Sequence, residues 1–188
     1  MPVIRESLTA IDRVPSDWGA RTGVSAVLVP LVGREESPRV LLTRRADTLR
    51  HHSGEISFPG GRSEPGDRDA LATALRETEE ETGIAPGMVD ALGLLHPVVT
   101  AVSNMEVHPV VGHVPDLPDL RPHPDEVAEI LVVDLAELAF GGCHRRELWR
   151  VDGEEREVHF FTTSQGHVIW GATARMLVDL FMTAATAS

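Results

Sequence analysis

The stretch Arg76-Glu77-Thr78-Glu79-Glu80-Glu81-Thr82-Gly83-Ile84 carries the strongest signal in the chain. On a helix with about 100° per residue, Glu77, Glu80 and Glu81 share one face. Carboxylates three and four residues apart repel one another, and the helix dipole disfavours anions in the last turn. A divalent cation reverses this balance, because carboxylate oxygens are natural ligands of Mg²⁺ and Mn²⁺. The face is therefore a candidate metal site, and the alternative is a solvated acidic helix end.

These glutamates end the clearest helix of the sequence, which we predict over residues 67–82. Either Asp67 or Asp69 can cap its N-terminus, because a carboxylate there accepts a hydrogen bond from a free backbone amide. Gly83 suits the position after the last turn, where a left-handed conformation is common. The side chains with the three- and four-residue spacing of a core-facing stripe are Leu71, Ala74, Leu75 and Thr78.

A loop rich in glycine and proline, residues 48–66, precedes this helix. Long ordered loops inside a compact domain are more often functional than idle. Its segment Phe58-Pro59-Gly60-Gly61 lets the backbone approach the helix closely, since glycine has no side chain. The Gly60 carbonyl is thus a candidate metal ligand, and Gly61 is a candidate contact to substrate phosphate.

Short β-rich runs surround the loop and the helix. The expected strands are 24–32, 39–43, 88–95, 107–114 and 130–133, followed by a hairpin of 148–151 and 157–162 around Asp152-Gly153. Further helices are expected from 135–138 and over 171–183. We interpret residues 1–22 as a lead-in arm and residues 23–188 as a single domain. Strands and helices in irregular order predict an α+β fold.

Together the loop and the helix resemble the Nudix box. In that pattern a glycine, five residues, a glutamate and seven residues precede Arg-Glu-(apolar)-x-Glu-Glu-x-Gly-(apolar). The matching positions are Gly61, Arg76, Glu77, Glu80, Glu81, Gly83 and Ile84, with Thr78 in an apolar slot. The resemblance implies an α/β/α sandwich with a mixed central sheet, in which the box forms a loop, a helix and a loop. It also implies a pyrophosphohydrolase that cleaves a phosphoanhydride with the help of a metal.

The upstream half of the box departs from the pattern. Five residues after Gly61 the chain has Asp67 in place of glutamate, and the gap to Arg76 is one residue longer than usual. The position counted back from Arg76 is Arg68. Asp67 and Glu64 are the two candidates for the upstream acidic role.

A second signature begins further upstream. The segment Leu41-Leu42-Thr43-Arg44-Arg45-Ala46, then Arg50, Gly54 and Phe58-Pro59-Gly60-Gly61, resembles the pattern L-L-T-x-R-[SA]-x₃-R-x₃-G-x₃-F-P-G-G. That pattern marks the coenzyme A pyrophosphatase branch of the Nudix family. The lengthened box and the stretch 169–174 are similar to this branch as well. The resemblance covers about residues 22–182. It implies cleavage of coenzyme A or acyl-CoA into 4′-phosphopantetheine and adenosine 3′,5′-bisphosphate.

The charge distribution is compatible with a substrate that carries several phosphates. The formal net charge of −12 argues against nucleic-acid and anionic-membrane partners. Yet residues 39–52 carry four arginines and one aspartate, directly before the acidic segment 61–84. Because arginine forks bind phosphate oxygens, Arg44, Arg45 and Arg50 are candidate substrate ligands. The alternative is that these arginines pair with the acidic helix.

We therefore expect Glu77, Glu80 and Glu81 to hold Mg²⁺ or Mn²⁺, with Arg76 orienting a carboxylate through a charge-assisted hydrogen bond. The general base is either one of the box glutamates or an acid of another loop, such as Glu126. Two rival functions remain open. One is hydrolysis of another nucleoside diphosphate derivative, such as ADP-ribose or a dinucleotide. The other is nucleotide sensing without catalysis.

Other features bear on the compartment and the partners. Cys143 is the single cysteine, which excludes an internal disulfide and fits a reducing compartment. The N-terminus lacks the apolar core of a secretory signal, and the longest apolar run, 24–32, is too short to span a bilayer. We expect a cytoplasmic enzyme that binds a small nucleotide such as coenzyme A, without nucleic-acid or membrane partners. Family analogy is compatible with a homodimer.

Overall fold

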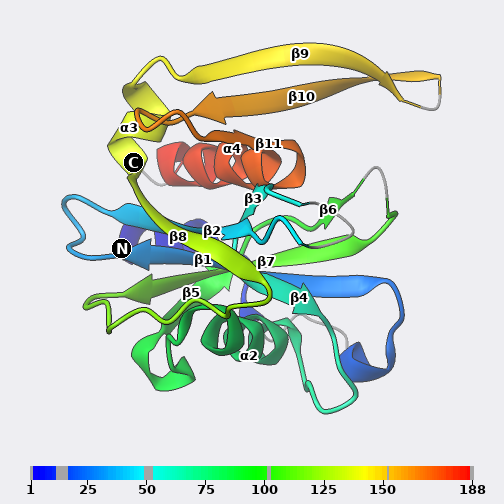
Figure 1. Ribbon diagram of the computed structural model, residues 1–188, viewed down its shortest axis with the longest axis vertical. Helices are drawn as coiled ribbons and strands as arrows, with labels where there is room; N and C mark the ends of the chain where they lie inside the picture. The colour runs from blue at the N-terminus through cyan, green and yellow to red at the C-terminus, as the bar shows by residue number, and fades with distance from the viewer. Residues whose placement is uncertain (1, 12–16, 49–52, 101–102, 152, 187–188) are drawn as a thin grey trace.

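The computed structural model describes residues 2–11, 17–48, 53–100, 103–151 and 153–186. A helix, a sheet and a second helix form three layers at its centre, and a further sheet lies outside them (Figure 1). A mixed β-sheet lies between helix α2 (Ala70–Thr82) on one side and helix α4 (Gly171–Thr186) on the other. A second sheet packs against α4 on the side away from the first. This arrangement confirms the α/β/α sandwich with a mixed central sheet that the sequence predicts.

The central sheet has the strand order β3-β2-β1-β7-β5, with β4 paired to β1, β6 to β7 and β8 to β2. Its strands are β1 (Val24–Val32), β2 (Arg39–Arg45), β3 (Ile56–Ser57), β4 (Gly60–Arg62), β5 (Asp90–Leu94), β6 (Val98–Val99), β7 (Glu106–Val114) and β8 (Val127–Asp134). The β1–β7 pair is parallel and the other pairs are antiparallel. Every residue of β1 except Val27 is buried. A strand covered on both faces explains this continuous apolar run.

Helix α2 begins at Ala70, three residues later than the sequence predicts. Asp69 caps it by accepting a hydrogen bond from the Ala72 amide at 2.7 Å, and Gly83 ends it in the left-handed conformation. The predicted core-facing stripe is partly wrong, because Leu71 and Leu75 are only half-buried. The buried positions are Ala70, Thr73, Ala74, Thr78, Glu81 and Thr82. These mostly small side chains let α2 lie close to β1 and β4.

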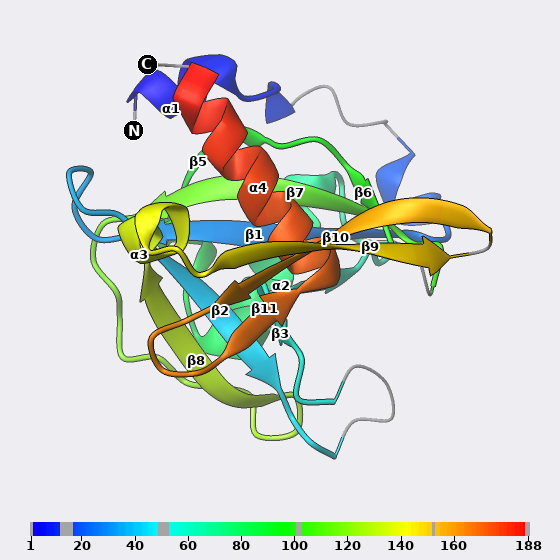
Figure 2. The same cartoon turned by 90° about the horizontal axis from the view of Figure 1, so that it is seen from above.

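The second sheet has the order β11-β10-β9, from β9 (His144–Val151), β10 (Glu154–Thr162) and β11 (Val168–Trp170). The β9–β10 pair is the predicted hairpin and is longer than predicted; Asp152 of its turn lies outside the described residues. Figure 2 shows α4 crossing the central sheet from this second sheet toward α1 (Pro2–Ser7). The remaining short helices are η3 (Pro86–Met88) and α3 (Leu135–Phe140), which follows β8 as expected.

The segment before β1 contains α1 and the 3-10 turn η2 (Trp18–Ala20). Trp18 is fully buried and packs with residues of β1 and α2, among them Leu28 and Ala74. The boundary between an arm at 1–22 and a domain from residue 23 stays a prediction. Within the described part of the chain, no helix combines the length and the apolar character that a membrane span requires.

Strand β4 approaches β1 so closely that residue 60 has to be glycine. Gly60 has a φ of +155°, and a Cβ there would lie 2.4 Å from the Ala26 carbonyl oxygen and 2.5 Å from the Val27 Cα. We expect Gly60→Ala to lower the free energy of unfolding by more than about 2 kcal/mol, measured in urea. The control is Gly66→Ala, whose Cβ meets nothing within 4 Å and should change stability by less than about 0.5 kcal/mol. Equal stability of the two variants would contradict the close approach.

Candidate active site

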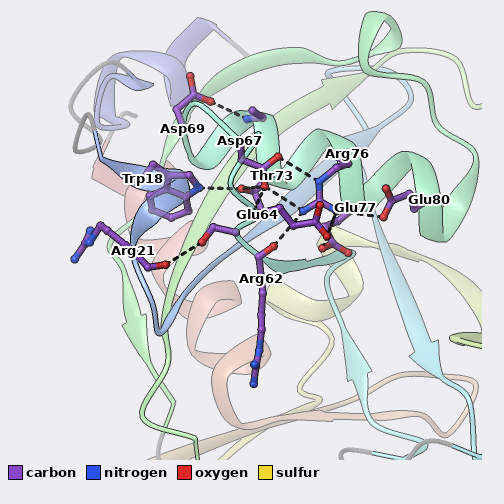
Figure 3. A network of polar contacts seen from close by, with 12 residues as sticks. Trp18, Arg21, Arg62, Glu64, Asp67, Asp69, Thr73, Arg76, Glu77 and Glu80 are labelled. Carbon is purple, nitrogen blue, oxygen red and sulfur yellow. Dashed lines mark hydrogen bonds and ion pairs between the residues drawn. The ribbon is translucent and has the colours of Figure 1, made fainter.

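Arg76 lies at the centre of a polar network on α2 (Figure 3). Its guanidinium binds Asp67 with two hydrogen bonds, from Nε to Oδ1 at 3.2 Å and from Nη2 to Oδ2 at 3.1 Å. Nη2 also donates to the Arg62 carbonyl at 3.1 Å. Nη1 donates to Glu77 Oε1 at 3.0 Å and to Glu80 Oε2 at 3.2 Å. One arginine therefore joins the glycine loop, Asp67 and two of the predicted ligands.

Asp67, and not Glu64, makes the paired contact with Arg76. The Glu64 side chain is 65% exposed and lies 4.0 Å from Nη1, whereas the Asp67 side chain is 7% exposed. Asp67 also accepts hydrogen bonds from the Glu64 amide at 2.9 Å and from the Thr73 hydroxyl at 2.8 Å. Burial opposes ionisation, but these donors and Arg76 outweigh it and hold the pKa of the Asp67 carboxyl below its usual value. Arg76 thus keeps a charged partner.

The Glu77 carboxylate lies against the glycine loop. A Cβ at Gly61 would lie 2.4 Å from the Glu77 carboxyl carbon, so a larger residue at position 61 would displace this carboxylate. Burial raises the pKa of Glu77; the charges of Glu80 and Glu126 act in the same direction, and Arg76 acts against them. The loop and the helix are therefore fitted to each other at this carboxylate.

Glu81 is the main correction to the sequence-based picture of the site. The helical wheel places it outward with Glu77, but Glu81 is only 4% exposed, and its Oε2 atom has no hydrogen-bond partner. Burial, with the charges of Glu77 and Glu126, raises the pKa of Glu81 to about 8, against the opposite effects of Arg45 and the Gly60 amide. A buried carboxylate in this setting is destabilised unless a proton or a cation joins it.

The carboxyl end of α2 is closed by the chain that leads into β8. Two backbone amides of that chain, those of Arg121 and His123, donate to the carbonyls of Thr82 and Glu81 at 2.8 and 3.1 Å. The same chain brings the exposed Glu126 close enough for its charge to raise the pKa of both Glu77 and Glu81. The fold thus gathers the predicted carboxylates from two distant parts of the sequence.

The predicted phosphate ligands have different surroundings. Arg50 lies outside the described residues. Arg45, at the end of β2, is close enough to Glu81 to lower its pKa, and its Nε atom is buried without a hydrogen-bond partner. Arg44 does not pair with the acidic helix. Its partners are Asp47 at 3.2 Å and Glu129 at 3.3 Å.

The oxygen ligands that this site offers are of the type that a hard divalent cation prefers. Glu77, Glu80 and Glu81 supply carboxylates, and the unpartnered Glu81 Oε2 is a buried acceptor that lacks a positive partner. As placed, however, Glu77 and Glu80 are bound to Arg76. Across the described ranges, no three His, Cys, Asp or Glu side chains are arranged to hold an ion. Arg76 binds only one oxygen of each glutamate, Glu77 Oε1 and Glu80 Oε2, so a shared ion would bind the second oxygen of each carboxylate after the side chains adjust.

Residues 22–161, most of the chain, match the model of the NUDIX domain. The chain belongs to the Nudix hydrolase family. The "uncharacterized Nudix hydrolase NudL" of Cronobacter sakazakii is 43% identical over 159 residues, which cover 83% of this chain and 80% of that protein. The protein of the same name from Escherichia coli K12 is 40% identical over 158 residues, which cover 83% of this chain and 80% of that protein.

Solved Nudix structures share the fold. A MutT/nudix family protein from Enterococcus faecalis gives a TM-score of 0.57 at 17% identity, over 88% of this chain and 63% of that chain. The binary complex of the Caenorhabditis elegans Ap4A hydrolase gives 0.50 at 20% identity, over 59% and 80%. At such identities the likeness supports the fold alone.

Two residues of this Nudix site have no signal in the box pattern. Thr73 donates to Asp67, and Trp18 in turn donates to Thr73 at 2.8 Å. Thr73 stands in the helix among other threonines, and Trp18 lies before the matched domain. Only the folded structure shows that they meet.

The raised pKa of Glu81 predicts a pH dependence of stability for the metal-free protein. The folded state keeps the Glu81 proton up to about pH 8, whereas the unfolded chain loses it near the ordinary value of 4.5. Between these values the folded state binds more protons, so stability falls as the pH rises. One proton contributes a slope of at most about 1.4 kcal/mol per pH unit. We expect Glu81→Gln to flatten this fall, measured by urea unfolding in chelator at several pH values.

Glu79→Gln is the matched control for this measurement. Glu79 is an exposed carboxylate of the same helix, and its loss should leave the slope of the wild-type protein unchanged. If stability falls with pH as steeply in Glu81→Gln as in the wild-type protein, Glu81 is not the group that holds the proton.

Proposed function

We propose that this Nudix pyrophosphohydrolase cleaves the phosphoanhydride of coenzyme A or of an acyl derivative. One water is consumed and adenosine 3′,5′-bisphosphate is released, together with 4′-phosphopantetheine from coenzyme A or its S-acyl form from an acyl-CoA. The observation that carries the proposal is the cluster in which Arg76 gathers Glu77 and Glu80 beside the buried carboxylate of Glu81, whose Oε2 has no hydrogen-bond partner. So much negative charge suits a phosphate substrate only when a divalent cation neutralises it.

The residues that would hold Mg²⁺ or Mn²⁺ are Glu77, Glu80 and Glu81, with the Gly60 carbonyl as a further candidate. When bound, such an ion neutralises charge on the phosphoanhydride oxygens and lowers the pKa of a water molecule. The close approach of Gly61 to the Glu77 carboxylate, and the effect of the Gly60 amide on the pKa of Glu81, support a role for the glycine loop beside these carboxylates.

The chain's own residues orient the reactants and move the proton. Asp67 holds one edge of the Arg76 guanidinium, so the other edge directs Glu77 and Glu80 to the same side. Glu126 is our candidate for the general base. It is exposed to solvent, its charge acts on Glu77, and a carboxylate in this position can take a proton from the attacking water. One of the box glutamates is the alternative.

The coenzyme A assignment rests on the signature from Leu41 to Gly61. That signature forms β2, β3 and β4, and β4 packs against the catalytic helix. The unpartnered Nε of Arg45 supports this residue as a phosphate ligand. Arg44, Arg50 and Gly61 remain predicted contacts to the substrate. The cytoplasmic location and the homodimer also remain predictions.

A second Nudix activity is kept as the alternative. The C. elegans protein of similar fold is an Ap4A hydrolase, so a dinucleotide or ADP-ribose is a reasonable rival substrate. Nucleotide sensing without catalysis fits less well, because all three glutamates of the box helix are present.

A substrate panel tests the choice between these activities. Coenzyme A, an acyl-CoA, ADP-ribose and Ap4A are each supplied with saturating Mg²⁺, and products are identified by mass spectrometry. We expect kcat/KM for coenzyme A or acyl-CoA to exceed the others by at least about tenfold, because the signature resembles that of the coenzyme A branch and its last residue, Gly61, lies against Glu77. A preference for ADP-ribose or Ap4A would overturn the proposed substrate but not the proposed hydrolysis of a phosphoanhydride. Binding without turnover of any compound would favour the sensor.

Glu80→Gln tests the predicted metal ligands. The neutral amide is a weaker ligand for Mg²⁺, so we expect kcat to fall at least about tenfold, the scale of losses even for indirect changes at metal sites. Glu79→Gln, in the same turn, should retain the rate of the wild-type enzyme. A normal rate in Glu80→Gln would remove Glu80 from the ligand set.

A further inference from the structure

Trp18 contacts the catalytic helix although it precedes the matched Nudix domain, which begins at residue 22. It is fully buried, and its Nε1 lies 2.8 Å from the Thr73 hydroxyl oxygen (Figure 3). That oxygen lies 2.8 Å from Asp67 Oδ2. The indole nitrogen can only donate a hydrogen bond. Thr73 therefore accepts from Trp18, and its single hydroxyl proton is available for Asp67.

Two other buried threonines of α2 show that the Thr73 hydroxyl could also have turned toward the helix backbone. Thr78 and Thr82 each donate to the carbonyl four residues earlier, at 2.6 Å. This back-bonding is a standard option for a helical threonine. The corresponding acceptor for Thr73 would be the Asp69 carbonyl, but the Thr73 hydroxyl is bonded to Trp18 and Asp67 instead. The indole N–H of Trp18 favours the rotamer that points away from this carbonyl.

A second contact joins the same turn to the same loop. A Cβ at Gly19 would lie 2.6 Å from the Asp67 carbonyl oxygen and 2.8 Å from that of Glu64. The turn η2 therefore rests directly on the backbone of the loop that carries Asp67. Any displacement of η2 also displaces the carboxylate that holds Arg76.

We propose that Trp18 is a positioning residue of this Nudix site. Its indole N–H orients the Thr73 hydroxyl, which fixes Asp67. Asp67 in turn fixes Arg76 and thereby the glutamates bound to it. The segment that precedes the Nudix domain is thus part of the catalytic architecture. The metal and kinetic readouts of this inference rest on the proposed function, whereas the relay itself rests on the hydrogen bonds.

A double-mutant cycle tests the relay. Trp18→Phe keeps a buried ring but loses the N–H, and Thr73→Val keeps the shape but loses the hydroxyl. We expect each single change to lower the Mn²⁺ affinity of the protein, measured by EPR, and kcat for coenzyme A by about tenfold. KM should stay within about twofold of the wild-type value, since the substrate contacts are untouched. The double variant should be no worse than Thr73→Val, because no hydroxyl remains to be oriented.

Two controls separate this role from packing. Thr73→Ser should restore most of the Mn²⁺ affinity and of kcat. Trp149→Phe loses an exposed indole hydrogen bond of the same length, to Glu147 at 2.8 Å on β9, and should behave as the wild-type protein. Thermal unfolding confirms that each variant is folded.

Several results would overturn the proposal. One is an unchanged Mn²⁺ affinity in folded Trp18→Phe, and another is additive losses in the double variant. If Trp18→Phe does not fold, equal Mn²⁺ affinities of Thr73→Val and Thr73→Ser would overturn the proposal. If the wild-type enzyme does not hydrolyse coenzyme A, the proposed substrate fails, and the Mn²⁺ measurement still tests the relay.

Discussion

The paired hydrogen bonds between Arg76 and Asp67 are the constraint on which the site depends. Two parallel contacts fix the plane of a guanidinium, which a single contact would leave free to rotate. The bond to Asp67 is also the largest cause that raises the pKa of Arg76, and the pKa of Asp67 is lowered in return. Both shifts favour the charged forms, so both groups are charged at neutral pH. Of the remaining N–H groups, the second of Nη2 donates to the Arg62 carbonyl, and those of Nη1 donate to Glu77 and Glu80.

The layered fold supplies the second constraint. Because α2 presents small side chains such as Ala74 and Thr78 to the sheet, it lies close enough to bury part of its acidic end as well. Glu81 is held inside by this packing, at an electrostatic cost that its raised pKa records. The packing of α2 on the sheet thus both stabilises the helix and buries the Glu81 Oε2 atom without a hydrogen-bond partner.

The sequence predicted the features that have a local pattern. The apolar run of β1, the glycine after α2 and the hairpin each follow from spacing or turn chemistry, and the box identified the glutamates. The orientation of Glu81 was missed because the helical wheel was set by Leu71 and Leu75, whereas close packing selected the smaller residues. The contacts of Trp18 and of the chain around His123 were missed because they join distant segments, and no local periodicity encodes them.

The closure of α2 by the Arg121 and His123 amides has a consequence for folding. Glu126 joins the glutamates of the box only when this long-range contact forms, so the isolated helix carries the box glutamates without the added charge of Glu126. A cation that recognises this combined charge binds the native state and not the unfolded chain. By mass action it then opposes unfolding. The free energy of unfolding would then depend on the concentration of the cation, as would the rate of the proposed reaction.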